Sequence, residues 1–415
     1  MLPLHETQLE PGSATRHVPS PYKSYGIGLS PRYLPAVSSH TLPTEAEKAN
    51  FIKTNRVWIV DYALFCALRD HFKTDDWRKW NRDLKRREKK ALDEWSEKLK
   101  KNIDHYVVLQ WKLDQSYTQL KKKAQELDIS LVGDLPFYLS VQSPLVWAHQ
   151  EVFQLDENGA MEFVSGVPNS PKAHFGRQVW GHPLYKWDSE NHRQTIIRFW
   201  KMRFRYLAKL FDFIRFDHAK GLFEYAAIDP LGGKEDTYRK GPGSTVFEEL
   251  VRHSHHYNLR IFAEDSGEKL QELRKSLRKL KIPGIKIFRF AFDQKRNKVN
   301  TEYADISGYS SSTVAYTTTH DTETLLGYLA LLNSDEKQNL ARFSYVKYHI
   351  DDLEFAKEIR NAIIESSAQM VIIPLQDWLL TTERINVPGT ELPINDPNWQ
   401  YRMKTAIEDI PDSFK

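Results

Sequence analysis

The chain has 415 residues, enough for one large domain with insertions or for two to three ordinary domains. Its 59 basic and 55 acidic residues leave a formal net charge of +4, which is too small an excess to indicate nucleic-acid binding. No apolar stretch approaches the ~18 residues of a membrane helix, and the N-terminus lacks the basic-then-apolar order of a signal peptide. With a single cysteine, Cys66, these features predict a soluble cytoplasmic protein without an internal disulfide.

The first part of the chain predicts loops followed by helices. Residues 1–45 are rich in Pro, Ser and Gly and predict loops around a short apolar run. Over 45–101, apolar side chains recur at three- and four-residue intervals, which predicts helices with one apolar face. The charged stretch 77–102 is more typical of a solvated helix with i,i+4 ion pairs than of a functional basic patch. Another helix is expected over about 106–127.

In the rest of the chain, short apolar runs alternate with amphipathic segments of helix length. Because strands separated by helices pair in parallel, the alternation predicts an α/β fold. No G-x-G-x-x-G or G-x-x-x-x-G-K-[ST] loop follows any of these runs, which argues against a nucleotide-binding fold. Polar or acidic residues after most runs favour a closed (β/α)8-type TIM barrel. The expected strands are 130–134, 211–217, 260–264, 284–290, 313–317 and 369–375.

The expected organisation is a single catalytic barrel domain over 1–415. Residues 45–128 would form a helical insertion subdomain together with one barrel helix. Two long segments rich in Gly, Pro and aromatic residues, 143–190 and 228–243, each follow the carboxyl end of a predicted strand. Because that end of a barrel carries the substrate site, these segments are predicted to be a groove insertion and a groove loop.

Two predicted strands end in carboxylates with informative neighbours. In the first, Arg215 and Asp217 point to the same side of the strand, so the guanidinium would keep the carboxylate ionised, as a glycosidase nucleophile requires. An ordinary strand-end salt bridge explains this pair equally well. In the second, Glu264 follows an apolar run, and apolar surroundings favour the protonated form that can supply a proton. Alone, Glu264 is as readily explained as a helix cap or an ion-pair residue.

A third strand end carries His320 and Asp321. An imidazole donor next to a carboxylate can bind two adjacent sugar hydroxyls. Metal binding is the rival interpretation, but the other histidines lie far away in the sequence. Each of the three strand ends is weak evidence alone, but an ionised carboxylate, a proton donor and a hydroxyl-binding pair together predict chemistry at a glycosidic bond.

Ordered motifs over about residues 2–402 add a resemblance to a known family. The chain resembles the amylomaltases, the 4-α-glucanotransferases or disproportionating enzymes of glycoside hydrolase family 77 in the α-amylase clan. The motifs include Gly133-Asp134-Leu135-Pro136, Gln178-Val179-Trp180-Gly181, Arg215-Phe216-Asp217-His218, Ala263-Glu264-Asp265, Thr319-His320-Asp321 and Glu383-Arg384-Ile385-Asn386-Val387-Pro388-Gly389-Thr390.

The resemblance implies a retaining double displacement. Asp217 would be the nucleophile, Glu264 the general acid and then base, and Asp321 the residue that stabilises the transition state. Arg215 would orient Asp217, while His320 and Asp134 would contact the same sugar. The groove positions carried over from the family are Gln178, Trp180, Asn386, Ser20 and Tyr22.

The resemblance also implies the ligands. The substrates would be α-1,4-glucans such as maltose, maltotriose and longer maltodextrins, with no metal or organic cofactor and with no nucleic acid or membrane as partner. Protein partners and oligomeric state stay open.

Several positions depart from the family's pattern. Thr318 stands where the family has Gly, Ser266 where it has Leu, His182 where it has Asn and Ile385 where it has Met, and Arg177 separates Gly176 from Gln178. These changes affect the expected chain-length preference and efficiency more than the reaction type.

The largest departure is at the N-terminus. The family begins with a βα unit before a second strand, and this chain is expected to open inside that second strand, at Met1-Leu2-Pro3-Leu4. One βα unit would then be missing, leaving unpaired strand edges near 2–4 and 371–375 and an unstable chain.

Three functions remain in competition. The first is transfer of α-1,4-glucan segments between maltodextrins. The second is hydrolysis by the same residues, because water competes with an acceptor sugar. The third is a truncated, inactive glucan-binding protein. All three strand-end carboxylates are present, which favours an active enzyme over a binding protein.

Overall fold

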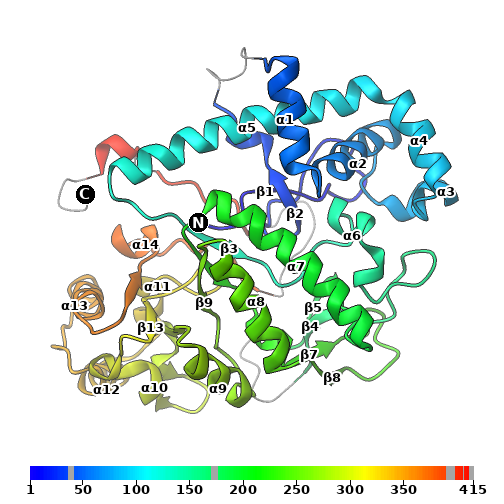
Figure 1. Cartoon of the computed structure of the whole chain (residues 1–415). Coiled ribbons are helices and arrows are strands. Elements are labelled where there is room, and N and C mark those ends of the chain that lie inside the picture. Colours follow the sequence, from blue (N-terminus) through cyan, green and yellow to red (C-terminus); the bar gives the residue numbers. More distant parts are fainter. Residues whose placement is uncertain (36–41, 170–175, 389–397, 405, 411–415) are drawn as a thin grey trace. The chain divides into compact units, whose positions relative to one another are not determined.

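The computed structural model describes residues 1–35, 42–169, 176–388, 398–404 and 406–410. The chain divides into two compact units, Met1–Ile261 and Phe262–Lys415, and each is described by itself. Figure 1 shows the helices and strands in chain order. The predicted single catalytic domain with insertions over 45–128, 143–190 and 228–243 stays a prediction.

The first unit opens with loops and then a run of helices. A capping box begins α1, because Thr44 accepts from the Glu47 backbone N–H while the Glu47 carboxylate accepts from the Thr44 N–H at 2.8 Å. The second helix is apolar on most sides and packs against the fifth, so its side chains form the centre of this region. The helices predicted over 45–101 and 106–127 are confirmed. Their bounds are α1 Glu45–Asn55, α2 Ile59–Phe72, α3 Arg82–Lys85, α4 Lys89–Lys98 and α5 Lys100–Glu126.

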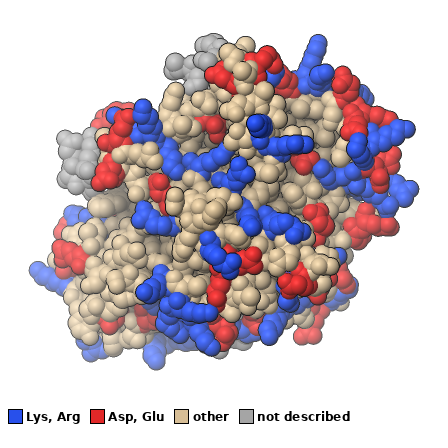
Figure 2. Space-filling model, in the orientation of Figure 1, with Lys and Arg blue, Asp and Glu red and all other residues tan. Residues whose placement is uncertain are grey.

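The charged part of this region is a solvated helix surface, as predicted. On α4, Lys89 lies 2.8 Å from Asp93 and Lys90 lies 3.9 Å from Glu94, both at i,i+4 spacing. Figure 2 shows basic and acidic side chains interspersed there rather than separated into a basic patch. Such exposed pairs contribute little to stability, so their role is to keep the helix soluble.

A parallel sheet forms the core of the first unit, with strand order β3-β6-β9. The strands are β3 Val132–Leu135, β6 Phe213–Phe216 and β9 Arg260–Ala263, the last of which begins in this unit. Two helices, α7 Glu190–Leu210 and α8 Ser244–His256, pack side by side (Figure 1). Trp200 of α7 stacks on Phe216 of β6 with ring centroids 5.2 Å apart.

Three antiparallel hairpins occur in the chain before and between the strands of this sheet. The sequence analysis did not predict them. They are β1 His5–Thr7 with β2 Ser24–Leu29, β4 Val164–Val167 with β5 Gln178–Pro183, and β7 Glu224–Ala227 with β8 Thr237–Lys240. The second and third hairpins touch through a bridge between Val164 and Ile228. Much of the two segments expected to be groove loops is therefore held by main-chain hydrogen bonds; residues 170–175 lie outside the described residues. A short helix, α6 Pro144–Ala148, also lies in the first of these segments.

The second unit is built on another parallel sheet, with strand order β10-β13-β14. Its strands are β10 Gly284–Ile287, β13 Thr313–Tyr316 and β14 Met370–Ile372. A small hairpin of β11 Phe292–Asp293 and β12 Lys298–Val299 follows the first of them. The helices are α9 Gln271–Leu280, α10 Thr301–Ala304, α11 Leu325–Leu329, α12 Ser334–Ser344, α13 Asp352–Ile364 and α14 Leu375–Trp378. Buried apolar residues including Phe288, Tyr328 and Phe355 form its core.

The parallel α/β prediction is confirmed, and each of the six expected strands is present but shorter at one or both ends. The strand expected over 284–290, for example, ends at Ile287 because a 3-10 turn over Phe288–Ala291 follows it. In the described residues these six strands form two three-stranded parallel sheets.

The prediction of a strand at Met1–Leu4 is wrong. The first strand, β1, begins at His5 and pairs antiparallel with β2. Pro3 has no N–H to donate to a neighbouring strand, which limits pairing over this stretch. The terminal amine of Met1 instead donates to the Val132 carbonyl at 2.5 Å.

None of the helices in the described part of the chain is long and apolar enough to cross a membrane.

A buried ionic cluster ties β1 to α2. The Glu6 carboxylate lies 2.9 Å from Arg69 Nη1 and 3.1 Å from His17 Nε2, and it accepts from the Tyr62 hydroxyl at 3.1 Å. Burial alone would raise the pKa of Glu6, but Arg69 and His17 outweigh it and hold the pKa at about 2. Because the folded-state pKa lies below the unfolded value of 4.5, the pair stabilises the fold above pH 4.5 and loses its effect between pH 4.5 and 2.

We therefore expect Glu6→Gln to lower the free energy of unfolding at pH 7 by about 3 kcal/mol, because Arg69 loses its buried counter-charge. The difference from the wild type should shrink as the pH falls from 4.5 towards 2. Urea unfolding at a series of pH values measures it. A constant difference over that range would contradict the assignment.

Candidate functional site

Four side chains at the end of the first unit's sheet form one hydrogen-bonded group. Arg215 of β6 pairs in register with Asp134 of β3, and its Nη1 lies 3.0 and 3.1 Å from the two Asp134 carboxylate oxygens. The other guanidinium nitrogen, Nη2, lies 2.9 Å from Asp217 Oδ1. Tyr22 donates its hydroxyl to Asp134 Oδ2 at 2.5 Å. The predicted pairing of Arg215 with Asp217 is confirmed.

The two carboxylates in this group differ in accessibility. The Asp134 side chain is 5% exposed and the Asp217 side chain 19%. Arg215 thus joins a buried carboxylate to one that solvent or a ligand can reach. His218, which follows Asp217, has φ of +46°, a conformation that non-glycine residues adopt rarely and often at functional sites.

Aromatic side chains extend the group away from the carboxylates. The Trp180 indole N–H donates to Gln178 Oε1 at 2.8 Å, and its ring lies 5.0 Å from that of His218. Lys23 donates to the Trp180 carbonyl at 2.5 Å. The buried hydroxyl of Ser20, another predicted groove residue, has no hydrogen-bond partner among the described residues.

His182, a departure from the family's pattern, lies in the same aromatic group. Its ring is parallel to that of Tyr138 within 10°, with centroids 6.4 Å apart. Burial, reinforced by the charge of Lys23, lowers the pKa of His182 well below its usual value. The residue is therefore neutral at physiological pH, as the family's asparagine is.

The second unit brings together Asp321, His320 and Asn386. His320 Nε2 lies 3.2 Å from Asp321 Oδ2, and Asn386 Nδ2 donates to Asp321 Oδ1 at 2.6 Å. The Asp321 side chain is 39% exposed, whereas His320 is 15% exposed. Both neighbours orient the carboxylate while leaving it open on one side. This arrangement suits a pair of ligand hydroxyls.

Three further residues fix this group, and the sequence reasoning gave them no role. Arg384 donates to the Asp321 carbonyl and to the Asn386 carbonyl, each at 2.7 Å, and lies 2.6 Å from Glu323. Arg289 lies 2.6 Å from the other oxygen of Glu323. One guanidinium thus holds the two segments that carry Asp321 and Asn386. The Glu383-Arg384-Ile385-Asn386 motif could have pointed to Arg384. The sequence does not show which distant residues Arg384 contacts.

Glu264 follows the last residue of β9. The hydroxyl of Ser266, which departs from the family's Leu, donates to Glu264 Oε1 at 2.9 Å. Its neighbour Asp265 points elsewhere: it lies 3.0 Å from Arg274 and accepts from the Ile285 N–H at 2.7 Å. Asp265 therefore anchors the loop to β10.

Thr318, which stands where the family has Gly, is buried and hydrogen-bonded. Its hydroxyl and that of Thr317 donate to Asp377 Oδ2 at 2.6 and 2.5 Å, and the Leu325 N–H donates to Oδ1 at 2.7 Å. Burial raises the pKa of Asp377. The extra side chain is accommodated because its hydroxyl shares an acceptor that already serves the neighbouring threonine.

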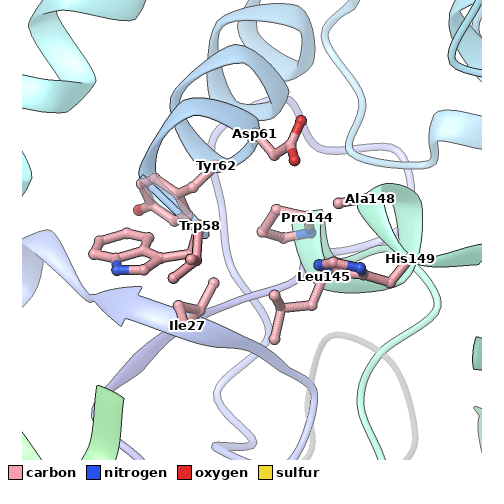
Figure 3. Close-up of a pocket in the computed structure, with 9 residues that line it drawn as sticks. Ile27, Trp58, Asp61, Tyr62, Pro144, Leu145, Ala148 and His149 are labelled. Atoms are coloured by element: carbon pink, nitrogen blue, oxygen red, sulfur yellow. The ribbon is translucent and has the colours of Figure 1, made fainter. Parts of the chain in front are cut away.

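No cluster of three or more metal-ligating side chains occurs within the part of the chain that the structure describes. Figure 3 shows a pocket beside α2, lined by Trp58, Tyr62 and Leu145 among others. It is too narrow to admit a water molecule. It is therefore a packing gap rather than a ligand site.

Comparison with known proteins identifies the fold and the family. Over its whole length the chain superposes on the amylomaltase from Streptococcus agalactiae, solved in complex with acarbose, with a TM-score of 0.83 at 24% identity and 88% of that chain covered. The fold is therefore that of the amylomaltases. Residues 29–408 match the 4-alpha-glucanotransferase family.

Two relatives agree with that match. The 4-alpha-glucanotransferase of Aquifex aeolicus is 34% identical over 86% of this chain and 70% of its own length. That of Synechocystis is 32% identical over 87% of this chain and 70% of its own length. The chain belongs to the 4-alpha-glucanotransferase family.

The predictions of family, of glucanotransferase function and of enzyme class are thereby confirmed. The amylomaltase fold supports the predicted TIM-barrel class, while the missing N-terminal βα unit is not confirmed. The structure describes Asp134, Arg215, Asp217 and Tyr22 within the first unit, and Glu264, His320, Asp321 and Asn386 within the second. The catalytic roles of these residues stay predictions.

Proposed function

We propose that the protein transfers α-1,4-glucan segments between maltodextrins by a retaining double displacement, with Asp217 as nucleophile. The observation that carries the proposal is the ion pair between Arg215 and Asp217 at the end of β6. A carboxylate that is partly exposed and fixed in direction by a neighbouring guanidinium is what attack on an anomeric carbon requires.

Glu264 is the proton donor and acceptor of the proposed reaction. In the first half it protonates the departing glycosidic oxygen, and in the second it removes the proton of the acceptor hydroxyl. Ser266 supports this role because its hydroxyl can hydrogen-bond either protonation state of the carboxyl group.

Asp321 binds hydroxyls of the sugar at which the reaction occurs, helped by His320 and Asn386. A charged acceptor gains strength as the ring gathers positive charge, so the contact stabilises the transition state more than the ground state. Arg215 orients Asp217, and Asp134 contacts the same sugar.

Gln178, Trp180, Tyr22 and Ser20 are proposed to contact the rest of the glucan. Maltose, maltotriose and longer maltodextrins are the expected substrates, in agreement with the acarbose bound to the Streptococcus agalactiae amylomaltase. The reaction as proposed needs no metal, organic cofactor, nucleic acid or membrane. A cytoplasmic location also remains a proposal.

The product pattern from maltotriose tests the proposal. Transfer gives glucose together with maltodextrins longer than maltotriose, whereas hydrolysis gives glucose and maltose alone. Binding without turnover would indicate the glucan-binding alternative. Chromatography of the products at early times separates the three outcomes, and the absence of longer maltodextrins would overturn the transferase assignment.

Arg384 is expected to position Asp321 and Asn386 in this reaction. Arg384→Lys should lower kcat by about 10- to 100-fold, because a compact ammonium cannot reproduce the planar spread of the three guanidinium contacts and a small displacement of a catalytic group is costly. The KM for maltotriose should change much less, since the contact strengthens in the transition state. Arg289→Lys is the matched control, because the Arg289 guanidinium donates to Glu323 at 2.6 Å and, among the described residues, to neither Asp321 nor Asn386. Equal losses in both variants would contradict the positioning role.

A further inference from the structure

A cleft lies in the first unit, between the β7–β8 hairpin, the segment that precedes β4 and the segment that follows β5. Its volume is about 680 Å³, within the about 300–1,000 Å³ range of small-molecule sites. Three aromatic side chains, Phe163, Trp187 and Tyr225, line it together with polar residues. None of the residues with a role in the proposed reaction is among its lining residues.

The polar side chains of the cleft are held in place before any ligand binds. Gln154 donates to the Tyr185 carbonyl at 2.8 Å and to the Tyr225 hydroxyl at 3.4 Å, and it accepts from Arg239 Nη1 at 3.2 Å. The Arg239 guanidinium also stacks on Phe163, 4.5 Å from the ring centroid. A fixed guanidinium has five N–H groups, so it can donate to ligand hydroxyls in addition to Gln154.

The charges of the cleft favour a neutral ligand. Three carboxylates and three cations line it, namely Asp156, Glu162 and Asp188 with Lys186, Arg239 and Lys240. Glu162 also lies 2.7 Å from Lys234 and Asp188 lies 2.6 Å from His192, two exposed contacts that solvent screens, so the cleft carries both signs of charge rather than a concentration of cations. A site for a phosphate or another anion would carry an excess of cations. Balanced donors and acceptors instead suit a ligand with many hydroxyl groups.

Aromatic faces and balanced polar groups together are what a pyranose chain requires, because its C–H faces pack on rings while its hydroxyls point sideways. We propose that this cleft is an accessory binding site for a segment of an α-glucan chain. The proposal rests on the proposed function, which supplies the class of ligand, and adds a second place on the protein where that ligand is held.

A row of packed aromatic rings connects the cleft with the aromatic group near Asp217. The buried Tyr185 ring lies 5.4 Å from Trp187 and 6.2 Å from Tyr138, and Tyr138 lies 5.8 Å from His218. A long glucan can therefore contact both the cleft and the Asp217 end of the sheet in the same molecule, whereas a short one occupies only one of these places at a time. Two linked contacts raise affinity without changing the chemical step.

Ala160→Trp is the test, because Ala160 is exposed, lines the cleft and interacts with the Asp156 turn through its backbone. Asn158→Trp is the matched control, placing the same side chain on the same exposed turn outside the lining residues. In Ala160→Trp the ratio of kcat/KM for a long linear maltodextrin to that for maltotriose should fall about fivefold or more. It should stay at the wild-type value in Asn158→Trp. An unchanged ratio in both variants would overturn the proposal.

A direct binding measurement separates this proposal from the proposed function. Amide hydrogen exchange with maltoheptaose, in chains that carry Asp217→Asn to prevent turnover, should show protection of residues 154–163 that Ala160→Trp removes. Such protection supports the cleft even if the wild-type chain transfers nothing, in which case only the proposed function fails. Protection by inorganic phosphate instead of maltoheptaose would overturn the neutral-ligand assignment.

Discussion

Asp217→Asn is expected to lower glucan transfer by about three orders of magnitude or more while leaving the fold intact. The amide is nearly isosteric with the carboxylate, so the hydrogen bond to Arg215 can persist. It cannot form the covalent glycosyl-enzyme, because its oxygen is a poor nucleophile. Disproportionation of maltotriose, followed from initial rates, measures the loss.

The matched control for this variant is Asp128→Asn. Asp128 is exposed and has φ of +55°, a conformation that Asn also tolerates, so neither folding nor transfer should change. Thermal unfolding of both variants should match that of the wild type. If Asp217→Asn kept more than about a tenth of the wild-type transfer rate, Asp217 would not be the nucleophile.

The pairing of charged residues at a strand end was predictable from the sequence, because it depends only on the alternation of side chains along one strand. The alternation of a strand fixes Arg215 and Asp217 on one side, and the hydrogen-bonded contact between them follows from that alone. The six parallel strands were predictable for a similar reason, since each is a short apolar run followed by a helix-length segment.

Contacts between distant segments were not predictable. Arg384 meets Glu323 and the Asp321 carbonyl across some 60 positions of the chain, and no periodicity in the sequence signals such a pair. The same is true of Thr318 and Asp377. The β4–β5 and β7–β8 hairpins were missed because few of their strand residues alternate cleanly between apolar and polar. The stretch expected to be a strand at Met1–Leu4 contains a proline, which has no N–H for strand pairing.

Glu264→Gln should slow transfer from ordinary maltodextrins by about 10² to 10⁴-fold, the usual contribution of a positioned general acid. An activated donor such as an α-glucosyl fluoride leaves without protonation, so the variant should still form the glycosyl-enzyme from it at a rate near that of the wild type. The ratio of the two donor rates therefore isolates the proton-transfer step from binding. Glu272→Gln, on the exposed first turn of α9, is the matched control and should leave both rates unchanged.

The second half of the reaction gives an independent check on Glu264. Without its general base, the glycosyl-enzyme formed from the activated donor should persist, because an acceptor hydroxyl must lose a proton to attack. Azide carries no such proton, so it should restore turnover and yield an α-glucosyl azide with retained configuration. Ser266→Ala should not reproduce this rescue, since it removes a hydrogen bond to the carboxyl group and not the group itself. Equal loss of rate with both donors, together with no effect of azide, would show that another residue moves the proton.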